Sequence, residues 1–277
     1  MSLSVNTNAA SLSAQSALQT AQNQLNTSLL RLSTGSQINS ASDNPAGLVT
    51  SSLQASQISG LQQSITNIQT GTALAQTADS SLSNINDLLV QIRSLASNSA
   101  NTATQSTASL AANSASANAL LASIDNIAST TKFGTVNLLD GSFSGAQFQT
   151  GAFSGQTASL TIAAADSTTL GVNGIDLTTA SGATAALTAI DAAISTVATA
   201  RGNIGSFISG TLTATQTNNQ SQLTNLQQAN SLLTDTNYQT EIANYTSESI
   251  KQQAASTVLG FANQSNSSIV TLLKNAG

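Results

Sequence analysis

The stretch that decides the fold covers residues 61–96 and reads LQQSITNIQTGTALAQTADSSLSNINDLLVQIRSLA. Apolar residues recur in it at intervals of seven, and a second apolar residue follows several of them three positions later. The first series is Leu61, Ile68, Ala75, Leu82, Leu89 and Ala96, and the second is Ala78, Ile85 and Ile92. This spacing, kept over five heptads, is typical of a coiled-coil seam. It predicts one long helix over about residues 58–99 that packs along its length against other helices.

Helical periodicity also precedes this stretch. Residues 6–33 carry Leu18, Leu25 and Leu32 at intervals of seven, and Gly35 is a natural end for a helix. The sequence therefore predicts a first helix close to the N-terminus.

A turn-rich connector occupies residues 33–47. Its Pro45 is the only proline in the chain and suits the first position of a new helix, with Asn44 or Asp43 as the cap. A second break, at residues 98–104, precedes a further helical pattern.

The second half of the chain becomes helical again. Residues 184–233 show 3-4 apolar spacing, and Asp235 could cap a last helix that continues to the end of the sequence.

The middle of the chain has a different pattern. Residues 131–183 are rich in glycine, and the segments 147–149 and 160–162 alternate as strands do. Turn-forming residues lie at 151–155 and 172–174. We expect a small β-hairpin region here. The predicted fold is therefore mainly α: a long antiparallel helical hairpin, or coiled-coil bundle, formed by both chain termini, with this β-hairpin region in the middle.

Composition restricts the function. Only 6% of the residues are charged, and the six lysines and arginines are too scattered to neutralise a row of phosphates. The chain has no cysteine and no histidine, which excludes disulfides, cysteine-based zinc sites and histidine-dependent catalysis. We expect no catalytic site, cofactor or metal, and no nucleic acid or membrane partner. The first residues, 1–6, lack the basic and apolar runs of a cleavable signal peptide, so we expect export by a dedicated route.

The terminal segments are expected to need neighbours. They are rich in Ser, Thr and Asn, each worse than Ala as a helix former by roughly 0.5 kcal/mol. Few oppositely charged pairs are available to compensate. We therefore expect the segments 58–99 and 184–233 to form an intramolecular core, and the terminal helices to bury their apolar faces between copies of the chain.

Two arginines fall near the predicted apolar faces. Arg93 and Arg201 could extend their charged heads to solvent, or each could pair with a nearby aspartate such as Asp87 or Asp191.

Several runs of residues resemble bacterial flagellin, the subunit of the flagellar filament. They are colinear and cover nearly the whole chain. At the N-terminal end they are Val5-Asn6-Thr7-Asn8, Ser28-Leu29-Leu30-Arg31-Leu32-Ser33-Thr34-Gly35, Asp43-Asn44-Pro45-Ala46-Gly47-Leu48, Gln91-Ile92-Arg93-Ser94-Leu95-Ala96 and Thr131-Lys132-Phe133-Gly134. At the C-terminal end they are Asp235-Thr236-Asn237-Tyr238, Lys251-Gln252-Gln253-Ala254 and Phe261-Ala262-Asn263-Gln264.

The resemblance implies a structural protein that polymerises helically into an extracellular filament serving motility. It implies that residues 1–43 and 235–277 form an inner tube, that residues 44–234 form an outer tube with the β-hairpin region at about 133–182, and that large outer domains are absent. It also implies export by the flagellar type III apparatus. An export chaperone, a filament cap and junction proteins are the implied partners.

The resemblance and the periodicity together give two sets of assembly and core residues. The inner-tube assembly interface is predicted to contain Leu18, Leu25, Leu29, Leu32, Ile242, Tyr245, Ile250, Val258, Phe261, Ile269 and Leu272. The outer-tube helical core is predicted to contain Leu61, Ile68, Leu82, Ile85, Leu89, Ile92, Ile190, Ile194, Val197, Ile204 and Ile208.

A third set concerns recognition by the vertebrate innate receptor. The resemblance places Gln91, Leu95 and Ser116 at the receptor-facing positions, where flagellins that are well detected have Arg, Leu and Glu. Because only the leucine matches, we expect weak detection.

Two alternatives accompany the filament hypothesis. A hook–filament junction protein shares the design of the terminal helices, although it generally lacks the C-terminal Gln252-Gln253-Ala254 pattern. A cell-surface glycan-binding homologue would need an exposed aromatic platform, for which the middle offers Phe143, Phe148 and Phe153.

Overall fold

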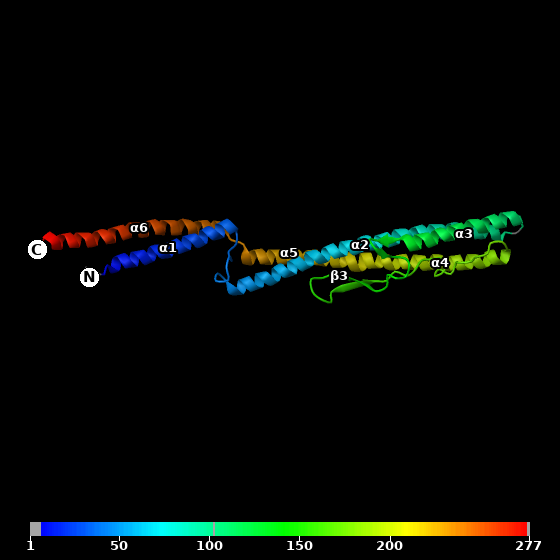
Figure 1. Cartoon of the computed structure of the whole chain (residues 1–277), viewed down its shortest axis with the longest axis horizontal. Coiled ribbons are helices and arrows are strands. Elements are labelled where there is room, and N and C mark those ends of the chain that lie inside the picture. The colour runs from blue at the N-terminus through cyan, green and yellow to red at the C-terminus, as the bar shows by residue number, and fades with distance from the viewer. Residues whose placement is uncertain (1–6, 102, 276–277) are drawn as a thin grey trace. The chain divides into compact units, whose positions relative to one another are not determined.

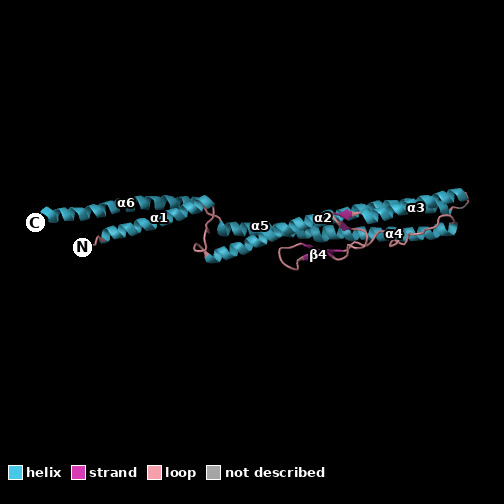
Figure 2. Ribbon diagram, viewed as in Figure 1, coloured by secondary structure: helices cyan, strands magenta, loops and turns pink. Residues whose placement is uncertain are grey.

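The computed structural model describes residues 7–101 and 103–275, with side-chain surroundings through Gln264. The chain is mainly α-helical, as predicted (Figures 1 and 2). In chain order the elements are α1 (Ala9–Thr34), α2 (Pro45–Ala100), α3 (Thr107–Thr130), β1 (Lys132–Phe133), β2 (Val136–Asn137), β3 (Ala146–Gln149), β4 (Thr157–Leu160), α4 (Ala180–Ser206), the π-helical segment η1 (Phe207–Thr213), α5 (Ala214–Thr234) and α6 (Tyr238–Asn275).

The chain divides into two compact units. Residues 1–56 and 226–277 form one, which we call the terminal unit, and residues 57–225 form the other, which we call the central unit. Each unit is described separately below.

The core of the central unit is the seam predicted from the heptads. Both apolar series of α2 are buried, and all their members except Leu61 join one hydrophobic cluster with α3 and α4. Of the predicted outer-tube core residues, Ile194 and Ile208 are half-buried against this cluster. The other nine are buried: Leu61, Ile68, Leu82, Ile85, Leu89, Ile92, Ile190, Val197 and Ile204.

The small β-hairpin region is also present. Strands β3 and β4 pair antiparallel with Phe148 opposite Ala158, and residues 150–156 form the loop between them. Strand β4 ends at Leu160, so Ile162 lies beyond it. Sequence reasoning missed a second hairpin, in which β1 and β2 are joined at Gly134, a residue with the left-handed φ of 62° that glycine favours.

The helix that returns along this core is continuous but changes its winding. Helices α4 and α5 are joined through η1, a seven-residue π-helix that the sequence pattern did not predict. The joined helix, Ala180–Thr234, is long and apolar enough to cross a membrane by length and composition, with a mean hydropathy of 1.4 over its most apolar window. Its inward face instead joins the core of the central unit.

In the terminal unit, α1 and α6 run antiparallel, side by side (Figure 1). The amide of Asn8 donates to the carbonyl of Ala262 at 2.9 Å, near one end of the pair. At the other end the backbone N–H of Thr236 donates to the carbonyl of Gly35 at 2.8 Å. Gly35 ends α1 in the left-handed conformation, with a φ of 70°, as the sequence predicted.

The caps of the other helices in this unit are only partly as predicted. Asn44 caps α2, because its side chain accepts from the N–H of Gly47 at 2.9 Å. The prediction that Asp235 caps the last helix is wrong. The cap of α6 is Asn237, whose side chain accepts from the N–H of Gln239 at 3.1 Å. The carboxylate of Asp235 instead accepts the hydroxyl of Ser231 at 2.5 Å, on the preceding helix.

Candidate assembly surface on the terminal helices

The contact face between α1 and α6 is made of small and polar side chains. On α1 the buried residues are Ala14, Ala21 and Ser28, at intervals of seven. On α6 the buried residue is Glu241, with only 7% of its surface exposed. None of these fully buried side chains is a large hydrocarbon, and the larger apolar side chains described on the two helices are at most half-buried.

The large apolar side chains of the same helices are on the outside. On α6, Ile250 is 61% exposed and Phe261 is 66% exposed. Ile250 follows Glu241 by nine residues, which is about 2.5 helical turns, so it points away from α1. On α1, Leu30 follows Ser28 by two residues, about 200° round the helix, and it too is exposed. Each terminal helix therefore presents an apolar face to solvent.

The predicted inner-tube residues fall into three groups. Leu18, Leu25, Leu32 and Tyr245 are half-buried, flanking the contact between α1 and α6. Leu29, Ile242, Ile250, Val258 and Phe261 are exposed. Ile269 and Leu272 lie outside the residues whose side chains are described.

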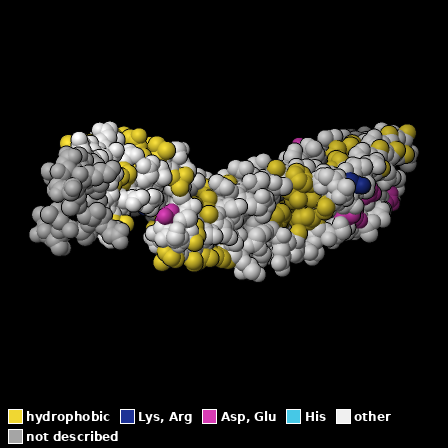
Figure 3. Space-filling view, turned by 60° about the vertical axis from the view of Figure 1, so that its left-hand side comes forward, with side chains coloured by type: hydrophobic (Ala, Val, Ile, Leu, Met, Phe, Trp, Pro, Cys, Tyr) yellow, Lys and Arg dark blue, Asp and Glu magenta, His cyan; other side chains and the backbone are white. Residues whose placement is uncertain are grey.

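Sequence reasoning missed other members of this exposed apolar surface, because they do not follow the heptad pattern. They are Leu12 and Leu30 on α1, Leu48, Val49 and Leu53 at the start of α2, and Leu232 at the end of α5. We call these residues, together with the five exposed ones of the predicted set, the assembly surface. The space-filling view in Figure 3 shows hydrophobic side chains reaching the surface in this part of the chain, with few charged atoms among them.

Several buried polar atoms of the terminal unit have no hydrogen-bond partner within the chain. Among the described residues, six buried side-chain atoms of the terminal unit have no hydrogen-bond partner, against one, Asn137 Oδ1, in the central unit. The six are Arg31 Nε, Gln54 Oε1, Asn230 Oδ1, Thr236 Oγ1, Glu241 Oε1 and Glu248 Oε2. A buried polar atom typically costs about 1–3 kcal/mol when nothing replaces its hydrogen bond to water. A groove of about 470 Å³ also remains between the two helices, lined by Ala17, Thr20, Glu248 and Ala255 among others.

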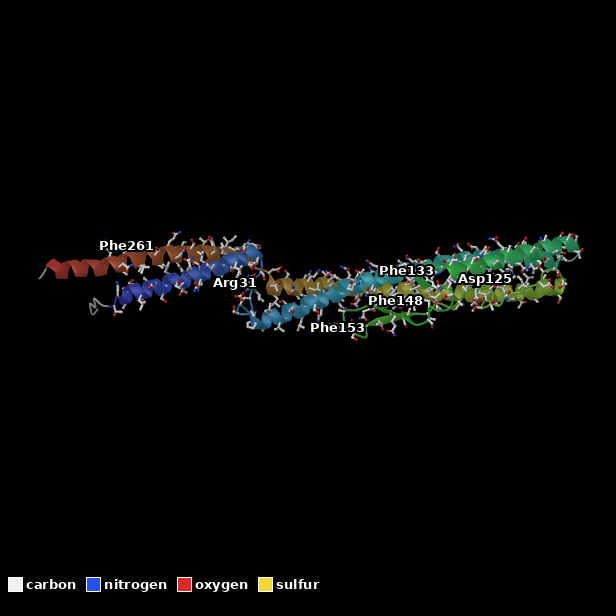
Figure 4. The ribbon with its side chains drawn as sticks, in the orientation of Figure 1. Arg31, Asp125, Phe133, Phe148, Phe153 and Phe261 are labelled. Atoms are coloured by element: carbon white, nitrogen blue, oxygen red, sulfur yellow. The ribbon has the colours of Figure 1, made fainter. Side chains whose placement is uncertain are left out.

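Charges in the terminal unit are few and local. Lys251 pairs with Glu248 on α6 at 2.7 Å. Asp43 accepts hydrogen bonds from the backbone N–H groups of Asn39 and Ser40, which, helped by the nearby Arg31, lower the pKa of its carboxyl. Figure 4 shows Arg31 on α1 and Phe261 on α6. The exposed apolar face therefore carries little charge that would oppose association.

In the central unit, both arginines near the apolar face pair with aspartates. Arg93 Nε lies 2.6 Å from Asp191, one of the two aspartates named from the sequence. Arg201 Nε lies 2.8 Å from Asp79, which was not named. The Arg93 guanidinium lowers the pKa of the Asp191 carboxyl. Both pairs are partly exposed, so they contribute more to the alignment of α2 with α4 than to stability.

The receptor-facing positions all lie in the central unit. Gln91 and Ser116 are exposed, on α2 and α3 respectively, whereas Leu95 is half-buried against the hydrophobic core.

Acidic and aromatic side chains in the part of the chain that the structure describes bear on metal binding and glycan binding. Among the described residues, no group of three acidic side chains could hold a metal ion. Phe143 is buried, and Phe148 is half-buried with its ring 6.0 Å from that of Phe207. Only Phe153 of the three middle phenylalanines is exposed, so the aromatic platform expected for a glycan-binding protein is not formed.

Comparison with known proteins gives matches at both ends of the chain. The model of the bacterial flagellin N-terminal helical region matches residues 5–144, and that of the C-terminal helical region matches residues 187–273. The "Flagellin" of Halalkalibacterium halodurans is 32% identical over 254 residues, covering 91% of this chain and 93% of that protein.

Other relatives are longer than this chain. The "B-type flagellin" of Pseudomonas aeruginosa is 42% identical over 171 residues, 62% of this chain and 35% of that protein. For "Polar flagellin C" of Vibrio parahaemolyticus, the chain spans 45% of the relative's length. The crystal structure of Bacillus cereus flagellin aligns with a TM-score of 0.48 at 25% identity, over 56% of this chain and 88% of that one. The two family matches and the nearly full-length relative lead to one conclusion: the chain belongs to the bacterial flagellin family.

Proposed function

We propose that this chain is a structural subunit that polymerises helically into the bacterial flagellar filament, outside the cell, and serves motility. The observation that carries the proposal is the exposed apolar face on each terminal helix. Large side chains such as Ile250 and Phe261 are exposed in the single chain, whereas the described side chains that α1 and α6 bury fully are small or polar.

Association between copies would remove these exposed apolar side chains from water. Each Å² of apolar surface removed from water contributes about 25 cal/mol, and the assembly surface lies on four helices of one unit. We propose that the contact between copies joins unlike patches of the terminal unit. A heterologous contact whose rotation does not close into a ring yields an open helical polymer.

The proposal assigns a role to each part of the chain. Residues 1–43 and 235–277 would form the inner tube, and residues 44–234 the outer tube. The separation of the chain into a terminal and a central unit supports this assignment, although the compact units divide at residues 56 and 226. Only residues 145–186 separate the two family matches, which supports the absence of large outer domains.

Membership of the family also supports a set of partners and an export route. An export chaperone, a filament cap and junction proteins would bind the subunit in turn, and the flagellar type III apparatus would export it. Co-purification of the subunit with a chaperone before export is the expected result. A subunit recovered alone under conditions that preserve such complexes would contradict it.

The assembly surface gives a direct test of polymerisation. We expect purified chain to form long filaments visible by electron microscopy, and Ile250→Ser with Phe261→Ser to abolish them while leaving helicity by circular dichroism nearly unchanged. Gln253→Ser, an exposed polar change on the same helix, is the matched control and should polymerise. Filaments of normal length from the double variant would contradict the proposal. Removal of residues 235–277 is the more drastic test and should also abolish filaments.

Because charges are scarce, filament stability should depend little on salt. A depolymerisation midpoint that shifts strongly between low and high ionic strength would count against an apolar interface.

The two alternative functions are not favoured. A junction protein would not be expected to polymerise into long filaments by itself, and the relatives that match this chain are named flagellins. A glycan-binding homologue lacks its aromatic platform.

We also propose that the vertebrate innate receptor detects this chain weakly. Gln91 and Ser116 are exposed but uncharged, so neither can form the ion pairs available to Arg and Glu at those positions. A reporter-cell assay should show low potency for the wild type and a gain for Gln91→Arg with Ser116→Glu. Potency equal to that of well-detected flagellins would refute the proposal.

A further inference from the structure

Asn173 is the one asparagine of the chain that is followed directly by a glycine, Gly174. In such a pair the backbone nitrogen of the glycine can reach the side-chain amide carbon of the asparagine, because glycine has no Cβ in the way and adopts many backbone conformations. Both residues lie in a turn of the central unit, between β4 and α4, and both are exposed. The surroundings of the pair decide whether the two groups can react.

The backbone is held in place up to Asn173. The N–H groups of Val172 and Asn173 both donate to the carbonyl of Ser167, at 2.9 and 3.1 Å. Ser167 is buried, and its N–H and hydroxyl donate to the carboxylate of Asp125 at 2.7 and 3.0 Å. Figure 4 shows Asp125 on α3. The turn is therefore tied to α3 on the N-terminal side of the pair.

The reacting groups of the pair are not held in this way. Among the residues that the structure describes, the N–H of Gly174 donates to no other group. The side-chain Nδ2 of Asn173 lies 3.5 Å from Thr168 Oγ1, which is the outer limit of a hydrogen bond. Gly174 has a φ of 73°, and nothing lies within 4 Å of the place where its Cβ would be. Neither hydrogen bonding nor crowding therefore opposes the approach of the two groups.

The pair Asp140-Gly141 provides a contrast within the same unit, since an aspartate followed by glycine can cyclise in the same way. The carboxylate of Asp140 accepts from the N–H of Ser142 at 2.9 Å and from its hydroxyl at 2.6 Å. It also accepts from Asn137 Nδ2 at 2.6 Å. This carboxylate would have to give up three hydrogen bonds before it could react.

We propose that Asn173 is a site of spontaneous covalent modification, namely deamidation through a cyclic imide. The backbone nitrogen of Gly174 attacks Cγ of Asn173 and forms a new C–N bond. The bond from Cγ to Nδ2 breaks, and ammonia leaves with the proton that the Gly174 nitrogen has lost. Water then adds to either carbonyl of the ring and opens it to aspartate or to isoaspartate. The reaction needs only water and no second copy of the chain, so it is independent of the proposed function.

The product changes the central unit in two ways. Either form adds a carboxylate to an exposed turn that already carries Asp166 and Asp176. The isoaspartate form also passes the backbone through the side-chain carbon, which lengthens the chain between Val172 and Leu177. Both of these residues are fully buried, so the modification alters a connection between two points of the core.

The test follows the full chain at mildly alkaline pH, folded in buffer or unfolded in urea, by peptide mapping and mass spectrometry. We expect position 173 of the folded chain to become aspartate and isoaspartate at a rate within about tenfold of that in the unfolded chain, because no hydrogen bond has to open first. A folded chain that is modified more than about tenfold more slowly than the unfolded chain would overturn the inference.

Two controls accompany this measurement. Isoaspartate at Asp140, compared with its own rate in urea, should be slowed by folding more than at Asn173, and equal slowing at the two sites would overturn the inference. Asn173→Gln should unfold like the wild type, because the position is exposed, and should remain unmodified, because its longer side chain would have to close a larger ring. Deamidation of this variant at position 173 at the wild-type rate would also overturn it.

Discussion

The central unit buries its large apolar side chains, whereas the terminal unit leaves many of its large apolar side chains exposed to solvent. In the central unit, α2 turns Ile85, Leu89 and Ile92 inward, and all three are fully buried. In the terminal unit, α6 turns Glu241 inward and Ile250 outward. The same helical periodicity thus produces a self-sufficient core in one unit and an exposed interface in the other.

This difference indicates that the residues that stabilise the fold of the monomer differ from those that are available for assembly. A helix bundle that buries its leucines is stable alone, whereas a pair of helices joined by alanine and serine is marginal until something covers the outside. The buried polar atoms without partners follow the same division, because nearly all of those described lie in the terminal unit. Substitutions in the two units should therefore change different measurements.

The largest expected effect is a cavity in the core of the central unit. Leu89→Ala should lower the free energy of unfolding of the monomer by about 2–5 kcal/mol, because a fully buried side chain leaves a void. Chemical denaturation of dilute monomer measures it. Ile250→Ala, on the exposed face of α6, is the matched control and should change monomer stability by less than about 0.5 kcal/mol. Equal losses of unfolding free energy from Leu89→Ala and Ile250→Ala would contradict the distinction between a buried core in the central unit and an exposed face in the terminal unit.

A smaller effect is expected from the buried amide of the central unit. Asn219→Ala should cost about 1–3 kcal/mol of monomer stability, since Ser64 and the carbonyl of Thr150 each lose a donor. The neighbouring Asn218→Ala, at an exposed position, should be nearly neutral in the same denaturation experiment. If both variants unfold like the wild type, the hydrogen bonds of Asn219 do not stabilise the β3–β4 hairpin.

The ion pair between α2 and α4 should matter less still. Arg93→Gln should return the pKa of Asp191 toward its ordinary value of 3.8, because the guanidinium is what lowers it. The loss of stability should be smaller than that of Asn219→Ala and should shrink as salt is added. Titration of the Asp191 carboxyl by nuclear magnetic resonance provides the readout, and an unchanged pKa would show that the pair does not form in solution.

The weakest expected effect is the response of the central unit to acid. Hydrogen bonds from Ser142 and from Thr178 lower the pKa values of Asp140 and Asp176 below the ordinary 3.8. A lowered pKa in the folded state means that the stabilisation is complete above pH 3.8 and is lost as the pH falls through the folded values. Monomer stability should therefore be flat near neutrality and decline below about pH 4, with a smaller decline in Asp140→Asn. A decline that begins near pH 6 would contradict this assignment.

Much of the fold could be predicted from the sequence, because the heptads of α2 allow only one inward face. The end of α1 at Gly35 and the start of α2 at Pro45 followed from residues with restricted backbone preferences. The cap of α6 did not, because Asp235 and Asn237 are both good caps. Asp235 instead accepts from Ser231, four residues earlier, and forms an isolated β-bridge with Ser36, which is a tertiary contact.

The assembly surface was harder to predict. A heptad pattern on α1 identifies Leu18 and Leu25, but these flank the contact with α6, while Leu12 and Leu30 are more exposed and do not follow the pattern. Periodicity gives the faces of a helix without saying which face meets which partner. The π-helical winding of η1 was likewise not predicted, since the apolar spacing of residues 184–233 indicates only a helix.

The central claim is that the terminal helices are stabilised by neighbouring copies, and amide hydrogen exchange tests it most directly. In dilute monomer, we expect the amides of α1 and α6 to exchange far faster than those of residues 61–96 in α2, and in filaments we expect all three to be protected. Strong protection of α1 and α6 in the monomer, equal to that of α2, would contradict the account.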